Sequence, residues 1–64
     1  MIVEDVNDVI GLNEEDAIDL LEATKTPWRV VEREGNRYTI ILNRVTGRIN
    51  LIIKGGKVEK AFRG

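Results

Sequence analysis

The chain contains no cysteine and no histidine among its 64 residues, and this absence limits how it can fold. It cannot form a disulfide, a zinc site of the usual kind, or a nucleophilic centre based on cysteine or histidine. A chain of this length buries a single modest core, with a net stability of about a few kcal/mol. We therefore predict one domain over residues 1–64, held together by packing alone.

The remaining polar residues give little support for catalysis. Gly55-Gly56 lies in a hairpin context and opens no predicted helix, so it is not a phosphate loop. Glu14, Glu15 and Asp16 are consecutive and point in different directions on a helix, where they stabilise its first turn rather than bind a metal. We expect a protein that is not an enzyme, needs no cofactor and acts by binding.

Membrane insertion is not expected either. The longest apolar runs, such as Leu51-Ile52-Ile53, are far too short to cross a bilayer. The acidic start, Met1 to Asp8, lacks the basic and apolar regions of a signal peptide. Because a secreted protein can also lack cysteine, the sequence leaves the localisation open.

Two kinds of periodicity divide the chain. After an irregular lead-in, Asn13 is a predicted cap for a helix of about three turns, which ends at Thr26-Pro27. From Trp28 the apolar period changes to two, which predicts strands. The predicted strands cover residues 28–33, 37–42, 48–53 and 58–62. The pattern predicts an α+β fold in which one helix packs on a small sheet.

The charges are distributed unevenly. Residues 1–24 carry eight acids and no base, whereas the rest of the chain carries ten bases and three acids. This division can mean a basic sheet that binds nucleic acid, or an acidic helix that compensates a basic sheet. We favour compensation, because Trp28, Tyr38 and Phe62 are the only aromatic residues and each is more often a core residue than a stacking platform.

An apolar segment followed by arginines stands out in the middle of the chain. Residues 38–43 lead into a polar loop bracketed by Arg44 and Arg48. A rigid extended loop of this kind could enter a protease cleft as a substrate does. The alternative is a plain hairpin with Ile40 and Leu42 in the core and a turn over residues 43–47. Spacing alone favours the hairpin.

Several short patterns, in order along nearly the whole chain, resemble the potato inhibitor I family of serine-protease inhibitors, including its bacterial and fungal relatives. These patterns are Asp8-Val9-Ile10-Gly11, Asn13 with Glu15-Asp16-Ala17, Arg29-Val30-Val31 with Gly35, Thr39, Arg48-Ile49-Asn50-Leu51, Gly56-Lys57-Val58 and Arg63-Gly64. The resemblance implies a mixed sheet whose first two main strands are parallel and joined by an exposed loop. A helix followed by an antiparallel meander is the competing topology.

The resemblance also implies a function and a site. It predicts a reversible, substrate-like inhibitor of a subtilisin- or chymotrypsin-like serine protease, acting through a loop around residues 36–47. The protease-binding residues would be Thr39, Ile40, Ile41, Leu42, Asn43 and Arg44. Arg48 and Asn50 would support this loop from the sheet, and Gly64 would pack beneath it.

The loop departs from the family pattern in ways that leave alternatives open. It is two residues longer than the usual loop, and Gly47 replaces the usual aspartate beside the arginine. Counting from Thr39 makes Ile40 the specificity residue, whereas counting back from Arg48 makes it Leu42. We favour Ile40. The alternatives to inhibition are an inhibitor-like scaffold without that activity and a small nucleic-acid-binding protein with a basic sheet.

Overall fold

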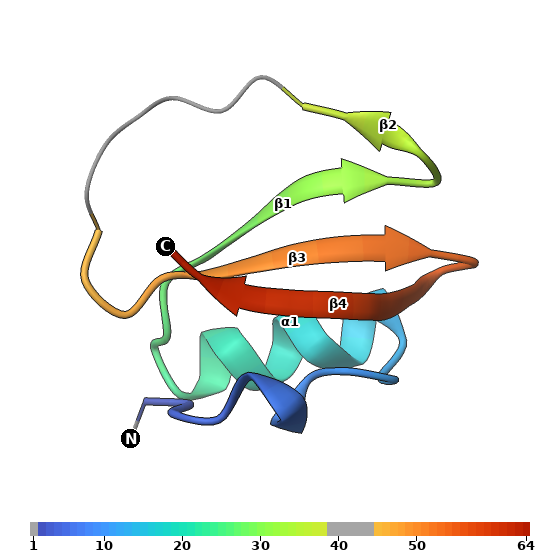
Figure 1. Cartoon of the computed structure of the whole chain (residues 1–64). Coiled ribbons are helices and arrows are strands. Elements are labelled where there is room, and N and C mark those ends of the chain that lie inside the picture. The colour runs from blue at the N-terminus through green and yellow to red at the C-terminus, as the bar shows by residue number, and fades with distance from the viewer. Residues whose placement is uncertain (1, 39–44) are drawn as a thin grey trace.

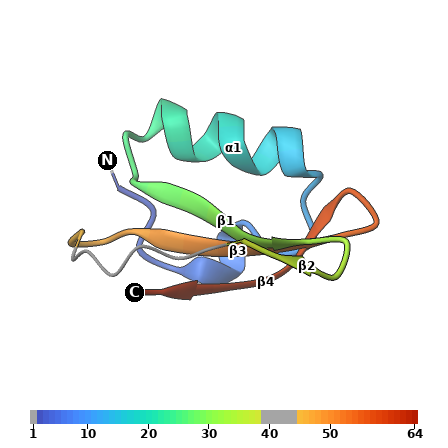
Figure 2. The ribbon, with the colours of Figure 1, turned by 90° about the horizontal axis from the view of Figure 1, so that it is seen from above.

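A computed structural model describes residues 2–38 and 45–64 of the chain. One α-helix packs across one face of a four-stranded sheet (Figures 1 and 2). A short 3₁₀ helix lies near the edge strand formed by the last residues of the chain. In chain order the elements are η1 (Val6–Asp8), α1 (Glu14–Ala23), β1 (Trp28–Arg33), β2 (Asn36–Arg37), β3 (Ile49–Lys54) and β4 (Lys57–Arg63). The predicted α+β class is confirmed.

The sheet has the order β2-β1-β3-β4 and is mixed. β1 pairs with β3 in parallel, from Trp28 opposite Ile49 to Arg33 opposite Ile53, and the other two pairings are antiparallel. Parallel strands need a long connection, whereas a meander would join neighbouring strands by tight turns. The predicted parallel arrangement is therefore confirmed, and the alternative antiparallel meander is wrong.

The second predicted strand differs from the observed one. A strand was predicted over residues 37–42, whereas β2 covers Asn36–Arg37 and forms a short antiparallel ladder with the end of β1. Residues 39–44 lie outside the part of the chain that the structure describes. The neighbours of β3 in the sheet are β1 and β4, so β2 and β3 do not form a hairpin.

The core lies between α1 and the sheet. Alternate residues of β3 face the helix. The buried apolar side chains come from the segment before α1, from α1 itself and from the sheet. They are Val3, Val9, Ala17, Leu21, Ile49, Leu51, Ile53 and Val58. Ala17 and Leu21 belong to the apolar stripe that the helical spacing predicted.

Asn13 is the N-cap residue of α1, as predicted, but a contact with the sheet fixes the start of the helix. The side chain of Asn13 makes no capping hydrogen bond. Instead, the backbone N–H of Glu14 donates to the carbonyl of Gly56, in the turn between β3 and β4, at 2.9 Å. A backbone carbonyl from a distant turn therefore satisfies an amide that a helix normally leaves open.

Glu34 lies in the turn between β1 and β2, and its side chain reaches the turn between β3 and β4. Its own backbone adopts a left-handed conformation, with φ of 50°. Its carboxylate accepts hydrogen bonds from the backbone N–H groups of Gly55 at 2.7 Å and Gly56 at 3.1 Å. These hydrogen bonds hold the pKa of Glu34 below its usual value, because they favour the ionised form.

We predict that Glu34→Gln lowers the free energy of unfolding at neutral pH. A carboxyl group whose pKa is depressed in the folded state stabilises the protein above its unfolded-state pKa, and that contribution is lost as the pH falls through the folded-state pKa. The difference between wild type and variant should thus be largest above about pH 5 and shrink as the solution becomes more acidic. Urea unfolding at several pH values measures it.

Glu4→Gln is the matched control for this experiment, because the side chain of Glu4 is exposed and makes no hydrogen bond within the described residues. A difference between wild type and Glu34→Gln that stays constant between pH 7 and pH 3 would contradict the proposed role of the carboxylate.

Candidate protease-binding site

The predicted site divides into a part outside the described structure and a part inside it. The protease-binding residues Thr39, Ile40, Ile41, Leu42, Asn43 and Arg44 lie outside the described residues. The predicted support residues Arg48, Asn50 and Gly64 are described, and the structure brings all three together. They meet where the chain enters β3, beside the end of the chain (Figure 1).

The carbonyl oxygen of Gly64 is the centre of this cluster. The guanidinium of Arg48 donates to it from Nε at 3.3 Å and from Nη2 at 3.1 Å. The side-chain amide of Asn50 donates to the same oxygen at 3.3 Å and to the carbonyl of Phe62 at 3.2 Å. The backbone N–H of Gly64 in turn donates to the carbonyl of Arg48 at 3.3 Å. The end of β4 is thereby fastened to the start of β3.

Arg29 is a fourth member of the cluster that the sequence did not assign to it. Its Nε donates to the side-chain oxygen of Asn50. The parallel register explains this contact, since Arg29 and Asn50 lie opposite each other on β1 and β3. Desolvation, followed by the positive charge of Arg48, holds the pKa of Arg29 below its usual value. Only the register of the parallel strands could have identified this residue.

The side chains of Arg48 and Asn50 are buried, although one of them is charged. Asn50 has 0% of its surface exposed and Arg48 has 7%. Burying a charge is costly unless hydrogen bonds satisfy it, and among the described residues no buried side-chain nitrogen or oxygen lacks a partner. A satisfied buried network of this kind fixes the positions of its members.

Gly64 fits closely against Asn50. A Cβ atom built on Gly64 would lie 3.2 Å from the side-chain nitrogen of Asn50, which is tighter than ordinary van der Waals contact. A larger residue at position 64 would therefore push the amide away from the carbonyl oxygens that it binds. The cluster favours glycine here because of the space available.

A turn leads from the predicted loop into this cluster. The backbone N–H of Arg48 donates to the carbonyl of Val45 at 3.3 Å, and Gly47 has φ of 77°. A glycine adopts this left-handed conformation without strain. The backbone N–H of Ile49 then donates to the carbonyl of Pro27 at 2.9 Å, which fixes the entry into β3 beside β1.

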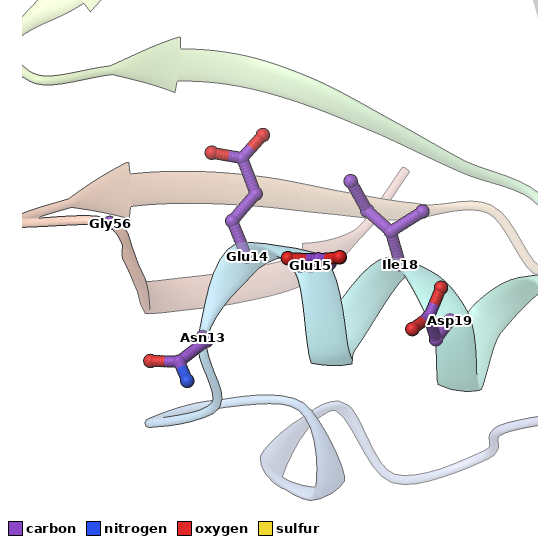
Figure 3. A pocket seen from close by; sticks show the side chains of 6 residues that line it. All are labelled: Asn13, Glu14, Glu15, Ile18, Asp19 and Gly56. Carbon is purple, nitrogen blue, oxygen red and sulfur yellow. The ribbon is translucent and has the colours of Figure 1, made fainter.

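The acidic residues at the start of α1 point in different directions. A shallow hollow beside this helix is lined by Asn13, Glu14, Glu15, Ile18, Asp19 and Gly56 (Figure 3). Glu14 points toward the sheet, where Arg33 binds it through both carboxylate oxygens, while Glu15 and Asp19 point in other directions. Within residues 2–38 and 45–64 no three acidic groups are arranged to hold a metal ion.

Comparisons with family models, curated proteins and solved structures found no match to this chain. The resemblance to the potato inhibitor I family therefore stays a prediction. Of the helices in the described ranges, none has both the length and the apolar character needed to cross a membrane.

We predict that Asn50→Ala destabilises the protein by about 2–3 kcal/mol, because the carbonyls of Phe62 and Gly64 and the guanidinium of Arg29 would lose a buried partner. Urea unfolding measures the loss. Asn7→Ala, an exposed position on η1, is the control and should change the stability by less than about 0.5 kcal/mol. A similar loss of stability in Asn50→Ala and Asn7→Ala would show that the hydrogen bonds of Asn50 do not stabilise the fold.

Proposed function

We propose that the chain is a reversible, substrate-like inhibitor of a serine protease of subtilisin or chymotrypsin type. The protease would bind the loop around residues 36–47, with Ile40 in its specificity pocket. The chain would supply no catalytic group and would need no cofactor. Leu42 is the alternative specificity residue, because two alignments of the loop remain open.

The buried cluster around the carbonyl of Gly64 is the observation that carries this proposal. It lies directly after the turn at residues 45–48, and so at the point where the proposed loop returns to the sheet. A domain with so small a core would be simpler to build with apolar side chains at these positions, because a buried ion often adds little net stability. The need for a fixed anchor at one end of a loop would explain why these positions carry polar residues.

The other end of the proposed loop is also tied to the sheet. Arg37 pairs with Glu32 in the ladder between β2 and β1, and the backbone N–H of Tyr38 donates to the carbonyl of Val31 at 3.0 Å. The side chain of Tyr38 lies against Arg33, with the guanidinium 5.7 Å from the ring centre. Both ends of the loop are therefore anchored before a partner binds.

Two anchored ends suit an inhibitor for a physical reason. A preorganised loop avoids most of the entropy cost of ordering on binding, so more of the contact energy appears as affinity. If the protease cuts the loop, the anchored ends stay close together, which favours resealing of the bond over release of a product. Because of these two effects, the protease would cleave and release the bound loop only slowly.

Titration against subtilisin and chymotrypsin with a chromogenic substrate tests the proposal. We expect tight inhibition by the wild type, and a loss of at least tenfold in either Ile40→Gly or Leu42→Gly but not equally in both, since one apolar side chain filling a pocket contributes roughly 1–3 kcal/mol. Absence of inhibition, or rapid cleavage of a folded chain, would overturn the proposal and leave an inhibitor-like scaffold.

Arg48→Lys tests whether the anchor matters. Lysine keeps the positive charge but cannot contact the carbonyl of Gly64 through two nitrogens as the guanidinium does. We expect inhibition to weaken by roughly tenfold and the loop to be cut faster, because the loss of about one charge-assisted hydrogen bond loosens its end. Lys25→Arg, an exposed exchange of the same two residue types at the end of α1, should leave inhibition unchanged.

A further inference from the structure

The face of the sheet that α1 leaves uncovered differs from the core face in the side chains that it carries. Figure 2 shows the helix on one side of the strands and no helix of comparable length on the other. Core residues such as Leu51 and Ile53 point toward α1, so the residues between them point to the opposite side. Ile52 lies there, opposite Glu32 on β1 and Lys60 on β4. We call this side the open face.

The centre of the open face is apolar. A shallow hollow is lined by Val31, Glu32, Arg37, Tyr38, Ile52 and Phe62. Phe62 is 46% exposed, which contradicts the expectation that each aromatic ring would belong to the core. Trp28 packs on the core, whereas Tyr38 is 42% exposed, lines the same hollow and lies against Arg33.

Cations surround this apolar centre. Lys54 and Lys57 lie opposite each other at one end of the β3–β4 ladder, and Lys60 pairs with Ile52. Arg37 lies opposite Glu32 at the other side of the face. The side chains of Arg37 and Lys54 are 88% and 74% exposed, and Lys57 and Lys60 are exposed as well.

The acidic helix does not neutralise these cations. Glu32 and Glu59 pair with Arg37 and Lys54 on the open face itself, at 3.4 Å and 3.9 Å. Of the ion pairs between described residues, one connects the helix to the sheet, and it joins Glu14 to Arg33. The expected compensation of the sheet by the helix is therefore limited to that pair, and the open face keeps an excess of positive charge.

The placing of Lys54 directly opposite Lys57 is itself informative. Like charges at directly opposed positions of an antiparallel ladder destabilise the pairing. Glu59 offsets part of this cost through Lys54, and a bound anion would offset more of it, because each ammonium group could then donate to the anion. Arg29 shares the face by register but is part of the buried cluster, so it is not needed for this argument.

We propose that the open face binds single-stranded nucleic acid. Lys54, Lys57, Lys60 and Arg37 would contact phosphates, and an unpaired base would stack on Phe62. The exposed ring of Phe62 favours a single strand over a duplex. The bases of a duplex are stacked on each other and offer no free face to the ring. This second binding surface lies on the sheet, and of its four proposed phosphate contacts Arg37 also falls within the proposed protease-binding loop.

Fluorescence anisotropy of labelled 12-residue oligothymidine and oligouridine strands, with the corresponding DNA duplex as a comparison, tests this proposal. We expect saturable binding of the single strands at 50 mM salt. With about four phosphate contacts, affinity should fall roughly fifty-fold between 50 and 200 mM salt, since each contact adds about −0.7 to the salt slope.

Two variants with controls locate the site. Lys60→Gln should weaken binding and reduce the salt slope by about 0.7, whereas Lys25→Gln, the same change of charge at the end of α1, should do neither. Phe62→Leu keeps an apolar side chain without the ring and should weaken single-strand binding by roughly tenfold while leaving weak duplex binding unchanged. Thermal unfolding of each variant confirms that it is folded.

Three binding results would overturn the proposal. These are no saturable binding at 50 mM salt, equal losses in Lys60→Gln and Lys25→Gln, and a duplex affinity that matches the single strands and is insensitive to Phe62→Leu. Sedimentation showing that a second copy of the chain occupies the open face would also overturn it, because a copy could present the acidic surface of α1 to these lysines.

Discussion

The parallel pairing of β1 with β3 is the constraint on which the rest of the structure depends. Parallel neighbours cannot be joined by a tight turn, so the chain must return along the sheet between Arg33 and Ile49. The same pairing sets Arg29 beside Asn50. Because β4 runs antiparallel to β3, its last residues come back to this end as well. The starts of two strands and the end of a third thus meet at one place, where the polar cluster fills the space between them.

Local pattern was enough to predict the elements but not their polar contacts. The helix follows from its apolar stripe, and its last turn ends before Thr26-Pro27, as the sequence indicated. The burial of Asn50 could not be read from the strand, because it lies on the face opposite the core, where its partners are Arg29 and the returning end of β4. Asn13 occupies the predicted N-cap position but makes no capping hydrogen bond through its side chain, and the amide of Glu14 donates to the carbonyl of Gly56, which is distant in sequence. In each case the deciding partner came from long-range pairing.

The two ends of the sheet are stabilised by different chemistry. At one end, the carboxylate of Glu34 binds two backbone amides near the surface, so its contribution depends on pH and on solvent screening. At the other end, Arg48 and Asn50 are buried and bind backbone carbonyls. A buried network of that kind contributes more to position than to net stability. The end with the fixed positions is the one from which the proposed protease-binding loop extends.

The cluster that supports the proposed loop and the open face are connected through β4. Asn50 belongs to the cluster and donates to the carbonyl of Phe62, whose ring is an exposed aromatic group of the open face. The backbone that carries this ring is therefore held by the same side chain that helps to anchor the chain end. A domain of this size has little interior, so most of its residues lie at the surface and one strand can serve more than one surface. The rigid polar cluster gives both the loop and the open face a common fixed support, which a small core could not provide by apolar packing alone.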